Sequence, residues 1–250
     1  ASRVPPPPSR ATPAFLAKAK TIVTVSDYAR SVITDHYKID KEKVSLIYPV
    51  VDEIFKPVDW EEKEIIKEKH TGGKAYFLFS GDIDQRSNII NLLKAFSFFK
   101  NRQKSNMLLL IAGRADESFK KELKTYKFRN EVMLLEDLAK DDLAKITAAA
   151  YALVYPVLYT DFSLPVLQAM QCNVPVVASN TGALPSICGD AALYTNPNDF
   201  KDIAENMMLV FKDEDKTAAM VSAGKVLLQQ YNSDKSADLL MQSIQKAFDN

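Results

Sequence analysis

The sequence predicts a doubly wound parallel α/β sheet with further helices at its C-terminal end. From residue 75 onward, short apolar segments alternate with segments of helical periodicity, as in successive strand–helix units. The apolar segments at 77–79 and 108–111 are continuous runs and do not alternate with polar residues. Continuous runs are typical of strands covered on both faces, which is the environment of strands in a parallel sheet.

The N-terminal part of the chain differs from the rest in composition. Residues 1–13 are rich in proline, and we expect them to be extended or disordered. A short helix is expected at 14–20 and a β-branched strand at 21–25, after which Ser26 is the expected N-cap of a helix at 27–37.

A change of composition near residues 37–43 predicts a domain boundary. We expect residues 1–38 to contain a disordered start and the last strand and helix of one domain. Residues 39–250 then form a second domain, which is the predicted parallel sheet with its helices.

The elements of the second domain follow from apolar runs bounded by turn residues and from helical periodicity. Expected strands are 44–48, 75–80, 107–112, 132–135, 152–155, 174–178 and 191–194. Expected helices are 61–70, 88–100, 118–126, 140–150, 164–171, 184–187, 199–212, 215–231 and 234–248. In such a sheet, ligands bind beyond the carboxyl ends of the strands, so the loops after residues 80, 112, 135, 155 and 178 are the candidate site.

Composition and charge exclude several kinds of function. Lys plus Arg and Asp plus Glu both number 32, so the formal net charge is zero, which argues against a nucleic-acid-binding protein. No apolar run reaches the ~18 residues of a membrane span, so we expect a cytoplasmic protein with at most peripheral membrane contact. Cys172 and Cys188 are expected to be buried free thiols, and we expect no metal and no cofactor.

Several segments resemble one enzyme family in both order and spacing. They read TIVTVSDY at 21–28, VSLIYPVVD at 44–52, LLIAG at 109–113, YTDFSLPVLQAM at 159–170 and NVPVVAS at 173–179. Together they resemble the family 4 (group 1) glycosyltransferases, which have the GT-B architecture. The resemblance implies that the chain is mainly the C-terminal, Rossmann-like donor domain, and that most of the N-terminal acceptor domain is missing from it.

The same resemblance implies an activity. Members of this family transfer sugar from a nucleotide-diphosphate sugar with retention of configuration and without a metal. The implied partners are a nucleotide-sugar and, through the missing domain, a glycan or lipid-linked acceptor in polysaccharide biosynthesis. The implied donor-binding or catalytic positions are Gly81, Asp82, Arg86, Ser87, Gly113, Arg114, Thr160, Asp161, Phe162, Ser163, Leu164 and Gln168.

Five positions lack the charged side chain that the family pattern has there. Asp82 and Ser87 stand where the family has two cations for the diphosphate. Thr160 and Gln168 replace two carboxylates, one beside the donor sugar and one at the ribose, and Ser186 replaces a further Glu. Each lost charged hydrogen bond costs roughly 1.5–3 kcal/mol. We therefore expect the rate of any transfer to fall by several decades.

One candidate anion site does not depend on those charges. The turn 161–163 precedes a helix with Pro165 in its first turn, and N–H groups near Ser163 and Leu164 can donate hydrogen bonds to a phosphate. An ordinary strand–turn–helix without a ligand is the alternative for this segment. For the whole protein, the alternatives to a glycosyltransferase are a catalytically degenerate binding or scaffolding relative and a different sugar-phosphate enzyme.

Overall fold

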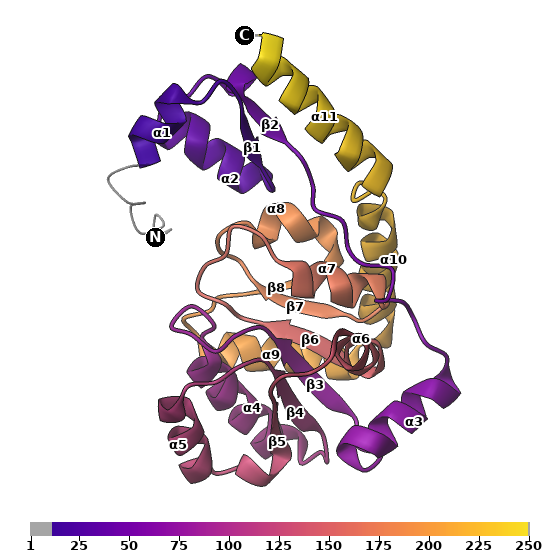
Figure 1. Ribbon diagram of the computed structural model, residues 1–250. Helices are drawn as coiled ribbons and strands as arrows, with labels where there is room; N and C mark the ends of the chain where they lie inside the picture. Colours follow the sequence, from indigo (N-terminus) through magenta and orange to yellow (C-terminus); the bar gives the residue numbers. More distant parts are fainter. Residues whose placement is uncertain (1–11, 250) are drawn as a thin grey trace.

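The computed structural model describes residues 12–249 and confirms the predicted doubly wound parallel sheet (Figure 1). Six strands lie in the order β5-β4-β3-β6-β7-β8, and every neighbouring pair is parallel. Their bounds are β3 (Tyr76–Ser80), β4 (Leu108–Ala112), β5 (Val132–Leu135), β6 (Ala152–Tyr155), β7 (Val176–Ser179) and β8 (Leu193–Thr195). The chain moves outward from β3 to β5, returns to β6 beside β3, and moves outward again to β8. The strand order therefore reverses between β3 and β6.

Helices cover both faces of this sheet (Figure 1). On one face α4 packs against α9, and on the other α6 packs between α3 and α7. The helices are α3 (Trp60–Thr71), α4 (Ile89–Gln103), α5 (Glu117–Thr125), α6 (Lys140–Ala149), α7 (Leu164–Gln171), α8 (Leu184–Cys188), α9 (Phe200–Lys212), α10 (Glu214–Leu228) and α11 (Ser233–Asp249). Short 3-10 turns lie at Lys41–Lys43, Arg129–Glu131 and Gly189–Ala191. All five residues of β3 are buried, as expected for a central strand with helices on both faces.

A second, smaller sheet lies apart from the first. It contains only β1 (Ile22–Thr24) and β2 (Val44–Leu46), in parallel, and is accompanied by α1 (Thr12–Lys18) and α2 (Asp27–Ser31). The final helix, α11, crosses back and packs against β1 (Figure 1). Although β2 follows the predicted boundary at residue 38, it pairs with β1. The division into domains at that residue stays a prediction.

Three of the differences between the expected and the observed elements are informative. Helix α1 begins at Thr12, with Pro13 in its first turn, where the missing N–H of proline costs no helical hydrogen bond. The expected helix at 27–37 is α-helical only to Ser31 and continues as a π-helix, Val32–His36. Strand β7 begins at Val176 because Pro175 has no N–H for the ladder. The extended segment expected at 1–13 lies almost wholly outside the described residues.

Candidate functional site

The pocket at the expected edge of the sheet lies where the strand order reverses. It has a volume of about 260 Å³ and is formed at the carboxyl ends of the adjacent strands β3 and β6. Ligands of open α/β sheets bind at this kind of switch point, because the loops on its two sides diverge and leave a crevice. The lining residues are Phe79, Gly81, Asp82, Asp84, Arg86, Ser87, Tyr155, Val157, Tyr159 and Thr160.

Two glycines let the loops after β3 and β4 approach each other. Gly81 has a φ of 141°, a conformation that glycine adopts most readily, and its N–H donates to the Ala112 carbonyl at 2.9 Å. A Cβ on Gly113 would lie 2.0 Å from the Gly81 carbonyl oxygen. Only glycine fits at 113 without a backbone shift, and the close contact fixes the loop that carries Asp82 at the pocket.

The loop after Gly81 contains a turn that begins at Asp84. The Asp84 carboxylate accepts hydrogen bonds from the backbone N–H groups of Arg86 at 2.8 Å and Ser87 at 3.0 Å. It also accepts from the Arg86 guanidinium, at 2.9 Å from Nε and 2.8 Å from Nη2. Arg86 is the one cation among the described lining residues, and this ion pair occupies part of its donor capacity.

The wall on the β6 side is aromatic and partly buried. The Tyr155 ring stacks on Phe79 at a centroid distance of 5.7 Å. Burial raises the pKa of Tyr155, and the neighbouring Ser163 hydroxyl offsets part of that rise. Ser163 is the N-cap position of α7 and is 1% exposed, so the start of this helix lies against the pocket wall. The Ser163 side chain makes no capping hydrogen bond within the described chain.

The small β1–β2 unit contacts this site directly. The Ser26 hydroxyl donates to the Asp161 carbonyl at 2.7 Å and accepts from the Ala29 N–H at 3.1 Å, which caps α2. The Tyr28 ring lies 6.0 Å from the Tyr159 ring, and the Tyr159 hydroxyl donates to the Asp161 carboxylate.

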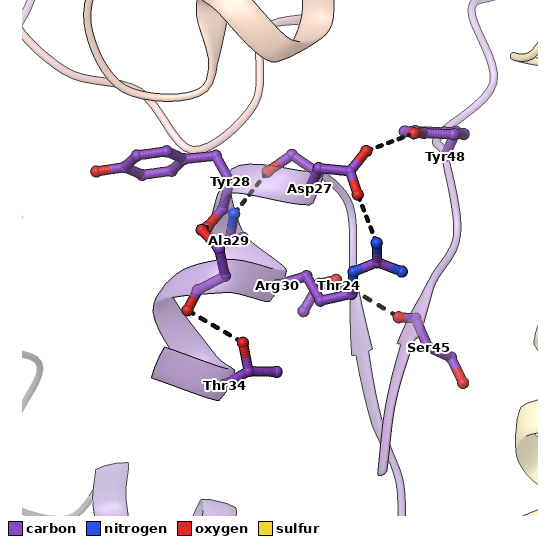
Figure 2. A network of polar contacts seen from close by, with 10 residues as sticks. Thr24, Asp27, Tyr28, Ala29, Arg30, Thr34, Ser45 and Tyr48 are labelled. Atoms are coloured by element: carbon purple, nitrogen blue, oxygen red, sulfur yellow. Dashed lines mark hydrogen bonds and ion pairs between the residues drawn. The ribbon is translucent and has the colours of Figure 1, made fainter. Parts of the chain in front are cut away.

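The same helix is anchored to its own unit on the other side. Figure 2 shows the Asp27 carboxylate between Tyr48 and Arg30, at 2.9 and 2.8 Å, while Tyr28 points away from them. Helix α2 therefore joins the loop after β6 to the smaller unit.

Ser26→Ala is expected to lower the free energy of unfolding by about 1–2 kcal/mol, because it removes both the α2 cap and the bond to the loop. Chemical denaturation followed by circular dichroism measures this loss. The control is Ser31→Ala, since the exposed Ser31 hydroxyl bonds only within α2 in the hydrogen bonds described. Equal stability of the two variants would contradict a bridging role for Ser26.

The structure brings together part of the predicted donor site. Gly81, Asp82, Arg86, Ser87 and Thr160 line one pocket, and Gly113 abuts Gly81. The remaining predicted residues lie outside the pocket lining: Arg114, Asp161, Phe162, Ser163, Leu164 and Gln168.

Two residues whose roles were predicted from the resemblance make other contacts. The Arg114 side chain is 80% exposed and lies 3.8 Å from the Asp137 carboxylate. The Ser186 hydroxyl donates to the Ala183 carbonyl within its own helical turn.

Sequence reasoning missed some residues of the site. Tyr155 and Tyr159 line the pocket. The Asn88 amide donates to the Pro156 carbonyl at 2.8 Å and to the Pro197 carbonyl at 2.6 Å. These two bonds connect the loop after β3 to the loops after β6 and β8. Their position at or beyond the carboxyl ends of strands was the available signal. Their contacts depend on strand order, which the sequence does not state.

Comparison with known proteins agrees with this arrangement. The family model described as "Glycosyl transferases group 1" matches residues 61–227, which include the sheet and the pocket. The chain belongs to the group 1 glycosyl transferases. The predicted membership and fold are thereby confirmed, while the roles of the individual site residues stay predictions.

Two group 1 relatives are bacterial mannosyltransferases. The chain is 28% identical to O-antigen chain mannosyltransferase B of Escherichia coli, over 87% of this chain and 58% of the relative. It is 31% identical to O-antigen chain mannosyltransferase RfbU of Salmonella typhimurium, over 74% of this chain and 49% of the relative. The chain thus spans about half the length of these relatives.

A solved structure shares the fold. HepE of Anabaena, in complex with UDP-glucose, superposes with a TM-score of 0.77 over 93% of this chain and 64% of HepE, at 17% identity. At that identity the likeness shows the fold alone. Among the described residues of the present chain, no helix combines the length and apolar character needed to cross a bilayer.

Proposed function

We propose that this chain is the nucleotide-sugar-binding part of a retaining glycosyltransferase that acts in polysaccharide biosynthesis. The observation that carries the proposal is the pocket at the switch point between β3 and β6, inside the region that matches the family model. The O-antigen mannosyltransferases among the relatives and the UDP-glucose complex of HepE support the class of reaction and of donor.

In this proposal two loops contact the donor, one after β3 and one after β6. A sugar that leaves a diphosphate builds negative charge on the departing oxygens, which a protein stabilises with fixed cations or N–H donors. Arg86 is the lining cation, and the first turn of α7 after Ser163 presents backbone N–H groups with the positive end of the helix dipole. Asp82 and Asp161 oppose the anion, so binding is expected to be weak.

Calorimetric titration of the 250-residue chain with UDP and GDP tests the proposal. We expect dissociation constants between about 10 μM and 1 mM, which correspond to roughly 4–7 kcal/mol. Adenosine, which lacks a diphosphate, is the control ligand and should not bind in this range. Absence of any heat with both diphosphates at several millimolar would contradict the proposed function.

A second candidate is a non-catalytic binding or scaffolding relative. Two structural observations favour it: the only described cation of the pocket lining is paired with Asp84, and the Thr160 hydroxyl donates to the Phe162 carbonyl instead of facing a ligand freely. The triple variant Ser87→Lys, Thr160→Glu, Gln168→Glu should then raise nucleotide affinity from a low base. Sugar transfer by the unmodified protein joined to its acceptor domain would rule this candidate out.

A further inference from the structure

We propose that Asp84 acts as an internal anion in this pocket: its carboxylate occupies N–H donors that a phosphate of the donor substrate would use, and so weakens diphosphate binding. The inference rests on the proposed function, since it concerns the same pocket. It assigns to Asp84 a role in competition with the ligand, beyond closing a turn.

The donor set around Asp84 is one that suits a phosphate. One carboxylate oxygen accepts from two successive backbone N–H groups, those of Arg86 and Ser87, at 2.8 and 3.0 Å. The other accepts from Nε and Nη2 of the Arg86 guanidinium at 2.9 and 2.8 Å. Successive N–H groups combined with a planar guanidinium are a recurrent arrangement for binding phosphate oxygens. Here an aspartate of the same loop already satisfies them.

Asp84 is ionised at neutral pH. Desolvation raises its pKa, but the hydrogen bonds from Arg86 and from the backbone together hold the pKa below its ordinary value. The carboxylate therefore carries a full negative charge in the pocket, and it repels the negative charge of a diphosphate. Asp82, on the same pocket wall, adds to the repulsion.

Both residues of the pair line the pocket and are exposed, so a ligand can reach them. The Arg86 side chain is 71% exposed and the Asp84 side chain 42%. Exposed ion pairs of this kind are weak, because water screens them. An incoming phosphate is therefore able to separate Arg86 from Asp84, but it must do so against the charge of the carboxylate. Removal of that charge should free Arg86 for the ligand.

The test compares binding of UDP, GDP and inorganic pyrophosphate to variants of the 250-residue chain by calorimetry. Asp84→Asn removes the charge, and Asp84→Ser does so with a side chain that can still close the turn. Both should tighten binding of all three probes by about tenfold. Arg86→Gln should weaken binding by about tenfold, also when it is combined with Asp84→Asn.

Asp142→Asn is the matched control, because it makes the same change in net charge. Asp142 lies on α6, outside the lining of the pocket, and its carboxylate pairs with the Lys69 ammonium at 3.2 Å. It should leave the dissociation constants unchanged within twofold. Circular dichroism verifies that each variant is folded.

The outcomes separate the two proposals. If the unmodified chain binds diphosphates and both Asp84 variants bind them no more tightly, Asp84 is not an internal anion, although the proposed function stands. If Asp142→Asn tightens binding as much as Asp84→Asn, the effect is one of net charge, and the inference is likewise overturned. If neither the unmodified chain nor either Asp84 variant binds any probe, both proposals fail.

Discussion

Gly113→Ala is expected to destabilise the chain by about 3 kcal/mol and to abolish nucleotide binding. A methyl group at this position would lie 2.0 Å from the Gly81 carbonyl oxygen and 2.6 Å from its carbonyl carbon. Both are backbone atoms, so no side-chain rotation relieves the overlap. The loop after β3 must move away from β4, and with it the pocket residues Asp82 to Ser87. Urea denaturation and calorimetry with UDP measure the two effects.

Gly72→Ala is the matched control for this prediction. Gly72 has a φ of 60° at the end of α3, yet a Cβ there meets nothing within 4 Å among the described residues. Its replacement isolates the cost of a left-handed backbone, about 1 kcal/mol, and should leave nucleotide binding intact. A Gly113→Ala variant as stable as Gly72→Ala, with normal binding, would show that the contact between the two loops does not shape the site.

Lys100→Met is expected to cost about 3 kcal/mol, because it leaves buried partners of a charge unsatisfied. The Lys100 side chain is only 5% exposed. Its ammonium pairs with the Glu131 carboxylate and donates to the Ser105 carbonyl and, at 3.1 Å, to the Met107 carbonyl. These contacts join the end of α4 to the starts of β4 and β5. Thermal or chemical unfolding followed by circular dichroism measures the loss.

The control and the rescue use neighbouring positions. Lys127→Met removes an exposed lysine that bonds to Asn101 at 3.3 Å and should cost under about 0.5 kcal/mol. Adding Glu131→Gln to Lys100→Met removes the uncompensated charge and should recover about 1 kcal/mol. If Lys100→Met costs no more than Lys127→Met, the buried lysine does not stabilise the sheet.

The sheet was predictable because its strands have a simple physical signature. The runs at β3 and β4 are almost wholly apolar, because helices cover both faces of the sheet. Such a run is recognisable in the sequence even when the elements that pack against it are unknown. The π-helix Val32–His36 was not predictable, because its turns have the same composition as an α-helix. A π-helix differs from an α-helix only in that each backbone hydrogen bond spans five residues instead of four, and the local sequence does not specify this difference.

The site was predictable in outline but not in its contacts. The loops after β3 and β6 follow from the rule that ligands bind at the carboxyl edge of parallel strands. The ion pair of Asp84 with Arg86 was not foreseen. The resemblance implied a donor-binding role for Arg86, and its contact with Asp84 depends on the turn that the loop adopts. Likewise, Tyr28 and Tyr159 are far apart in sequence, and only the placement of α2 brings their rings together.

Hydrogen–deuterium exchange with and without saturating UDP or GDP reports which segments of the chain the nucleotide contacts. We expect slower exchange at the amides of residues 81–88, after β3, and 160–167, after β6, with little change in α3 or α11. Protection confined to other segments, under conditions where calorimetry shows binding, would contradict a diphosphate site at the switch point between β3 and β6.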